Sequence, residues 1–145
     1  MKSVISLVLL LAAMVLSTNA MAQAEGVWFN QEKTAHVEIY KNPQNSKLYG
    51  KIVWLKEPND EKGNPKTDPE NPNPALRKRS RLGMVMLTGF VADGKNYWTG
   101  GEIYNPKDGK TYSCNMTLQA DGTLKLRGYM GISLIGKTQI WTRAK

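Results

Sequence analysis

Residues 111–128 read TYSCNMTLQADGTLKLRG and combine two strand patterns with a tight-turn signal between them. The first half alternates polar side chains with Tyr112, Cys114, Met116 and Leu118. Leu124 and Leu126 continue the alternation after the turn. Because strand side chains point alternately to two faces, each half has one apolar face and one polar face. The dipeptide Asp121-Gly122 tolerates the positive φ angles of tight hairpins, so the stretch predicts an antiparallel hairpin with one buried face.

Similar patterns recur from residue 26 onward, with further hairpin signals at Asp93-Gly94 and Asp108-Gly109. In the third pattern, alternation places Leu48, Gly50, Ile52 and Trp54 on one face. Consecutive strands joined by short turns predict an all-β, eight-stranded antiparallel up-and-down barrel, whose closure leaves no exposed edge. The predicted strands cover 26–30, 34–41, 47–56, 84–91, 96–105, 111–119, 123–131 and 137–143.

Two other β architectures compete with this barrel. A sandwich needs longer crossover connections than these turns provide. An outer-membrane barrel has strands of similar length, but it needs a lipid-facing apolar face on every strand. Here the polar faces carry Lys, Arg and Glu, which is typical of a solvated exterior.

Residues 57–83 interrupt the pattern with a long connection rich in Pro, Asn, Asp and Lys. Connections of this length are uncommon in compact domains and are often functional. Asn73 followed by Pro74 is typical of a helix start, with Asn as N-cap and Pro at the first helical position. We therefore expect a short helical turn over about 74–79 that covers one end of the barrel.

Residues 1–24 have the pattern of a secretory signal peptide. Lys2 precedes a run of apolar residues, and two small-x-small sites follow at 20–22 and 22–24. We expect cleavage there, a single barrel domain over 25–145 without a transmembrane span, and a periplasmic or secreted location.

Composition excludes several classes of site. One Cys cannot form a disulfide within the chain, and one Cys with one His cannot build a Cys/His zinc module. No spacing of His or carboxylates predicts a metal site, and none predicts a cofactor. The formal net charge of +8 and the aromatic residues would suit a single-strand nucleic-acid binder, but export argues against that partner.

The chain resembles DUF2147, a family of exported bacterial proteins, over nearly all of the predicted mature part. The matching stretches include GVW at 26–28, LYGKIVWL at 48–55, NPNPALR at 71–77, WTGGEIYNP at 98–106 and WTR at 141–143. The resemblance implies a lipocalin-like barrel and leaves the activity open. It also suggests that Arg143 packs across Trp28 and closes one barrel end, a structural role with favourable cation–π geometry.

No catalytic constellation stands out, so the sequence favours binding over catalysis. His36 has no identifiable partner or nucleophile, and Cys114 lies on an apolar face without a basic neighbour in its strand. The cluster Arg77-Lys78-Arg79-Ser80-Arg81 is either a solvated surface or an anion site at the mouth of the barrel.

We expect the barrel to bind a small amphipathic or hydrophobic ligand, such as an anionic lipid. The alternative is a structural or protein-interaction module of the envelope with a side-chain-filled barrel, whose partner is an envelope protein. The candidate ligand-binding residues are Trp54, Arg77, Arg79, Arg81, Trp98, Glu102, Tyr104, Tyr112 and Tyr129.

Overall fold

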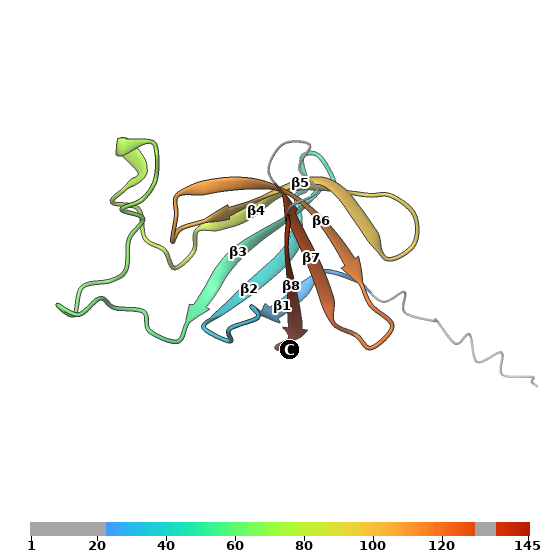
Figure 1. Ribbon diagram of the computed structural model, residues 1–145, viewed down its shortest axis with the longest axis horizontal. Coiled ribbons are helices and arrows are strands. Elements are labelled where there is room, and N and C mark those ends of the chain that lie inside the picture. The colour runs from blue at the N-terminus through green and yellow to red at the C-terminus, as the bar shows by residue number, and fades with distance from the viewer. Residues whose placement is uncertain (1–22, 130–135) are drawn as a thin grey trace, which may run out of the picture.

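A computed structural model describes residues 23–129 and 136–145, and its eight strands form one closed antiparallel barrel (Figure 1). Every strand pairs with its neighbours in the chain, and β1 pairs with β8 to close the ring. The predicted all-β up-and-down barrel is therefore confirmed. The strands are β1 (Gly26–Phe29), β2 (Ala35–Lys41), β3 (Leu48–Leu55), β4 (Val85–Ala92), β5 (Tyr97–Asn105), β6 (Lys110–Leu118), β7 (Leu124–Tyr129) and β8 (Gly136–Arg143).

Parts of two predictions fall outside the described residues. The predicted signal peptide, 1–24, lies outside them except for Gln23 and Ala24. The predicted strand 123–131 extends two residues beyond the described part of β7. Within the described ranges, no helix is long and apolar enough to cross a membrane.

Alternation along the strands produces the core. In β6 the side chains of Cys114, Met116 and Leu118 are buried, and the residues between them are more exposed. Buried side chains fill the half of the barrel near the connections 42–47, 93–96 and 119–123, which we call the closed end. These side chains include Trp28, Ile39, Leu48, Phe90, Met116, Leu118 and Leu124.

Arg143 stacks on Trp28 at the closed end. The guanidinium carbon lies 4.1 Å from the centre of the Trp28 ring, and its two terminal nitrogens donate to the carbonyls of Glu25 and Gln23. The indole of Trp28 is fully buried and donates to the carbonyl of Ala24 at 2.7 Å. A Cβ at Gly26 would lie 2.7 Å from the guanidinium, so a glycine there leaves room for the stack.

One predicted inner-face residue, Trp54, lies on the outer face instead. β2 pairs His36 with Trp54 but Val37 with Ile52, so Val53 is an extra residue in β3. This β-bulge shifts the alternation by one residue and turns Trp54 outward. There Trp54 is 39% exposed and packs on the His36 ring, with 4.4 Å between ring centres.

The connection between β3 and β4 contains only a short 3₁₀ turn, η1 (Pro74–Leu76), rather than a helical turn over 74–79. Asn73 caps it as predicted, because its side chain accepts from the backbone N–H of Ala75. The turn stops early because the carbonyl of Arg77 accepts from the N–H of Asp68 instead of continuing a helix. In Figure 1 this green segment extends to one side of the barrel.

Candidate functional site

A cavity of about 840 Å³ occupies the half of the barrel that the core leaves open. It reaches the end that carries the connections 30–34, 56–84 and 106–109, which we call the open end. Pockets for drug-sized ligands typically span about 300–1,000 Å³, so this volume suits a small molecule. The apolar wall comprises Ala35, Val37, Ile52, Leu55, Met86, Ile103, Leu126 and Trp141.

The bulge in β3 shapes this wall. Because Val53 is the extra residue, Leu55 pairs with Ala35 and lines the cavity, while Trp54 lies outside it. An aliphatic side chain thus takes the inner position that regular alternation would give to an indole. The bulge therefore helps to keep this half of the barrel open.

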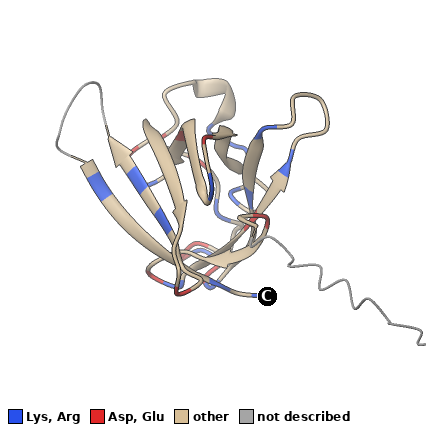
Figure 2. Cartoon of the chain, turned by 90° about the vertical axis from the view of Figure 1, so that its right-hand side faces the viewer, with Lys and Arg blue, Asp and Glu red and all other residues tan. Residues whose placement is uncertain are grey.

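The charged residues on the cavity wall carry an excess of positive charge. They are Arg81, Lys107 and Lys137 against a single carboxylate, Glu32. Lys137 pairs with Gly128 in the β7–β8 register, and both residues line the cavity. Figure 2 shows Lys and Arg positions in blue on β7 and β8, and those of β7, Lys125 and Arg127, alternate with the buried Leu124 and Leu126 and do not line the cavity.

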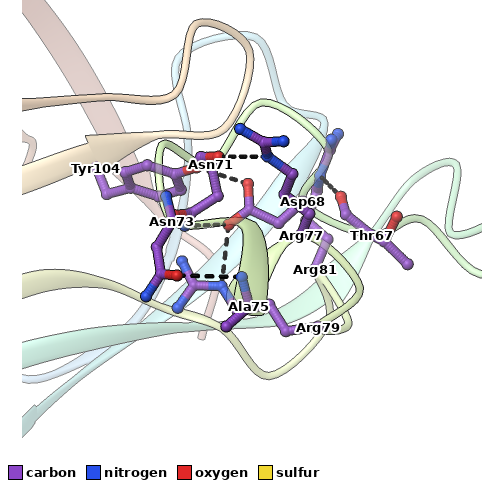
Figure 3. A network of polar contacts seen from close by, with 9 residues as sticks. All are labelled: Thr67, Asp68, Asn71, Asn73, Ala75, Arg77, Arg79, Arg81 and Tyr104. Atoms are coloured by element: carbon purple, nitrogen blue, oxygen red, sulfur yellow. Dashed lines mark hydrogen bonds and ion pairs between the residues drawn. The ribbon is translucent and has the colours of Figure 1, made fainter.

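A buried carboxylate joins the long connection to the cavity wall. Asp68 is fully buried, and its Oδ1 accepts from the hydroxyl of Tyr104 at 2.6 Å. Its Oδ2 accepts from the amide of Asn71 at 2.8 Å and from Nε of Arg79 at 3.0 Å (Figure 3). Tyr104 belongs to β5 and lines the cavity, so this Asp68 network ties the connection to the barrel.

The protonation states in the network follow from its contacts. Burial alone would raise the pKa of Asp68, but hydrogen bonds from Tyr104, Asn71 and Arg79 together lower the pKa below the ordinary 3.8. Burial and the hydrogen bond to Asp68 raise the pKa of the Tyr104 hydroxyl. At neutral pH the carboxylate is therefore ionised and the tyrosine remains the proton donor.

The same connection packs on the β5–β6 turn. Gly109 has φ +69°, and a Cβ at this position would overlap the carbonyl of Glu70. Within the connection, the N–H of Arg81 donates to the carbonyl of Lys66 at 2.9 Å. The segment is thus a folded part of the barrel rim.

Four of the nine predicted ligand-binding residues line the cavity. Tyr104 and Tyr112 come from β5 and β6, and Tyr129 ends the described part of β7. Arg81 comes from the connection between β3 and β4. The hydroxyl of Tyr112 also bonds the carboxylate of Asp108 in the adjacent turn.

The other five do not line the cavity. Trp54 faces outward because of the bulge, and Glu102 is exposed on β5. Trp98 packs against the core, where it pairs with Met116 in the β5–β6 register. Arg79 is engaged by Asp68, and Arg77 donates from Nε to the carbonyl of Asn71.

Sequence reasoning did not single out Asp68, Lys107 or Lys137. Asp68 resembles the solvated acidic residues around it, since only folding of the connection onto β5 buries it. Strand alternation could have predicted that Lys137 faces inward, because it lies two and four residues before Gln139 and Trp141, which also line the cavity. Lys107 lies in a turn, where alternation gives no inward or outward assignment.

The two side chains considered for catalysis, Cys114 and His36, lie in different parts of the barrel. Burial raises the pKa of the Cys114 thiol to about 12, so the thiol stays protonated at neutral pH although it lines the cavity. Burial, with a contribution from Lys145, lowers the pKa of His36, which packs edge-to-face against Phe29 on the outer face. In the described part of the chain, no group of three or more His, Cys, Asp or Glu residues could hold a metal ion.

Comparisons with known proteins agree with this architecture. Residues 26–143 match the family described as "Uncharacterized protein conserved in bacteria (DUF2147)". Among solved structures, the chain is similar to protein HP1028 of Helicobacter pylori, described as belonging to the lipocalin family. The two are 32% identical, with a TM-score of 0.72, over 86% of this chain and 84% of the other. No curated protein shows significant sequence similarity.

Proposed function

Because the chain belongs to the DUF2147 family, whose description assigns no activity, we propose its function from the geometry of the barrel. The protein binds a small hydrophobic or amphipathic molecule in the cavity. The observation that carries this proposal is the cavity of about 840 Å³, with an apolar wall and an open, polar end. Ligand sites typically combine such a wall with a few polar groups that orient the ligand.

The similarity to a lipocalin-family protein supports the same function. Lipocalin barrels have eight strands, a size at which the interior can hold one small ligand. Here the closed half is filled by side chains and the open half is not. The partial filling favours ligand binding over the second candidate, an envelope interaction module with a filled barrel.

We also propose that the protein acts outside the cytoplasm. The signal-peptide pattern at 1–24 supports this location. N-terminal sequencing of the protein from a periplasmic or culture fraction should give Gln23 as the first residue, because cleavage before Glu25 would remove the carbonyls of Gln23 and Ala24 that accept from Arg143 and Trp28. A chain that keeps Met1 and fractionates with the cytoplasm would contradict export.

Fluorescence titration with the neutral probe N-phenyl-1-naphthylamine tests the binding function. We expect saturable binding by the wild type and a loss of roughly tenfold or more in affinity for Ala35→Phe, which fills the cavity from β2. The matched control is Ala92→Phe, since Ala92 is an exposed strand residue that does not line the cavity. Absence of saturable binding, or equal affinities for both variants, would contradict the proposal.

A further inference from the structure

We infer that the cavity selects an anionic amphiphile, whose head group binds Arg81 while its apolar part lies in the barrel. The inference rests on the proposed function, that the cavity binds a ligand, and adds the chemical class of the ligand and the residue that recognises it. Carboxylate and phosphate heads share the required chemistry, since both accept parallel hydrogen bonds from a guanidinium.

The three arginines of the cluster have different surroundings, and two of them are poor candidates. Arg79 forms an ion pair with the buried carboxylate of Asp68, with 3.0 Å between Nε and Oδ2. Its charge is therefore compensated within the protein. Arg77 is exposed and does not line the cavity.

Arg81 differs from both. It lines the cavity and is partly buried, and Nε donates to the carbonyl of Thr67 at 3.2 Å. Within the part of the chain that the structure describes, Arg81 has no ion pair and its terminal nitrogens make no hydrogen bond. Since a partly desolvated cation without a counter-charge is unfavourable, an anion from solution would gain affinity here.

Arg81 is also held in place before any ligand arrives. Its backbone N–H donates to the carbonyl of Lys66, and its side chain bonds Thr67, the residue next to Asp68 (Figure 3). The Asp68 network thus anchors the segment to which Arg81 is bonded. A preorganised guanidinium loses less side-chain freedom on binding than a mobile one.

The remaining charges on the wall support an anionic head. Lys107 and Lys137 add positive charge, and Glu32 is the carboxylate that opposes them. Lys137 also lies close enough to Asp108 to help lower the pKa of that carboxyl, so Lys137 is partly compensated. Arg81 and Lys107 are therefore the cations most available to a ligand.

Isothermal titration calorimetry with three dodecyl probes tests the inference. Dodecanoate and dodecyl phosphate carry the two anionic heads, and dodecanol has the same chain with a neutral head. We expect at least one anionic probe to bind about 10-fold to 100-fold more tightly than dodecanol, as a charge-assisted contact provides. Arg81→Gln should remove most of this preference and leave the affinity for dodecanol unchanged.

The matched control is Lys78→Gln, which removes the same charge from an exposed residue of the same segment that does not line the cavity. It should leave all affinities unchanged. If Arg81→Gln does not fold, Lys107→Gln and added NaCl should each weaken the anionic probes selectively. Equal binding of dodecanol and both anions by the wild type would overturn the inference and leave the proposed function standing. If no dodecyl probe binds while N-phenyl-1-naphthylamine does, the inference fails and the proposed function stands; if neither binds, both fail.

Discussion

Two interactions between charged and aromatic side chains stabilise the two ends of the barrel. At the closed end, Arg143 stacks on Trp28 and ties the residues before β1 to the last strand. At the open end, Asp68 accepts from Tyr104 and ties the long connection to β5. Both interactions join segments that are far apart in the sequence, so each should contribute to the global stability of the fold.

Replacement of Asp68 by Asn tests the contribution of the buried carboxylate. An amide cannot accept with both terminal atoms from Tyr104, Asn71 and Arg79, so at least one donor of the network loses its partner. We expect a loss of about 1–3 kcal/mol in the free energy of unfolding, measured by urea titration. Glu57→Gln is the control because its exposed pair with Lys66 should contribute less than about 1 kcal/mol. Equal losses for both variants would contradict the role of Asp68.

The pH dependence of stability tests the charge state of Asp68. Its pKa in the folded protein lies below the ordinary 3.8, so its contribution is present above that value and is lost as the pH falls through the folded pKa. The wild type should therefore lose stability between about pH 5 and pH 2, and Asp68→Asn should lose less. Part of the loss should remain, because the pKa values of Asp108 and Asp121 are also lowered. Parallel curves for the two proteins would show that Asp68 contributes no pH-dependent stability.

At the residue scale, the sequence predicted some of the residues that line the cavity, but it did not predict which side chains bond to one another. Tyr112 shares the inward alternation of Cys114 and Met116, so the strand pattern predicted that it lines the cavity. Tyr104 and Tyr129 alternate in step with the exposed Glu102 and Arg127, so the strand pattern did not predict that they also line it. Arg77, Arg79 and Arg81 look equivalent in the sequence, and only the fold of 57–83 separates their roles. A tertiary contact such as that of Asp68 with Tyr104 spans 36 residues and leaves no local pattern.

At the scale of elements, the bulge in β3 and the packing of the long connection shape the open end. The bulge gives the inner position to Leu55 and the outer one to Trp54. Sequence alternation predicted the strand but could not reveal the bulge, because Val53 is as good a strand former as its neighbours. The connection was predicted as a long irregular segment, and its short turn followed from Asn73 and Pro74.

Two glycines in equivalent Asp-Gly turns allow a matched test of this packing. Gly109 and Gly122 both have positive φ, but only a Cβ at Gly109 meets another segment, at the carbonyl of Glu70. Both alanine variants should lose about 1–2 kcal/mol from backbone strain. Gly109→Ala should lose more and should expose residues 57–83 to trypsin, as limited proteolysis would show. Equal cleavage rates in Gly109→Ala and Gly122→Ala would mean that the connection does not depend on this contact.

At the scale of the whole molecule, one barrel combines a packed half with an open half. Periodicity and turn residues predicted the strand number, order and closure, because short hairpins leave few other topologies. They could not predict the cavity, since its volume depends on which inner positions carry large side chains and on where β3 bulges. The half-open barrel is the observation from which we propose that the protein binds a small molecule, the central claim.

Native mass spectrometry of the protein purified from its own cells tests that claim most directly. The native mass should exceed the denatured mass by a few hundred daltons, as expected for one bound small molecule, and the excess should be reduced in Ala35→Phe. The mass difference would also restrict the identity of the ligand. A native mass equal to the denatured mass, for protein that has met no detergent or organic solvent, would contradict the account.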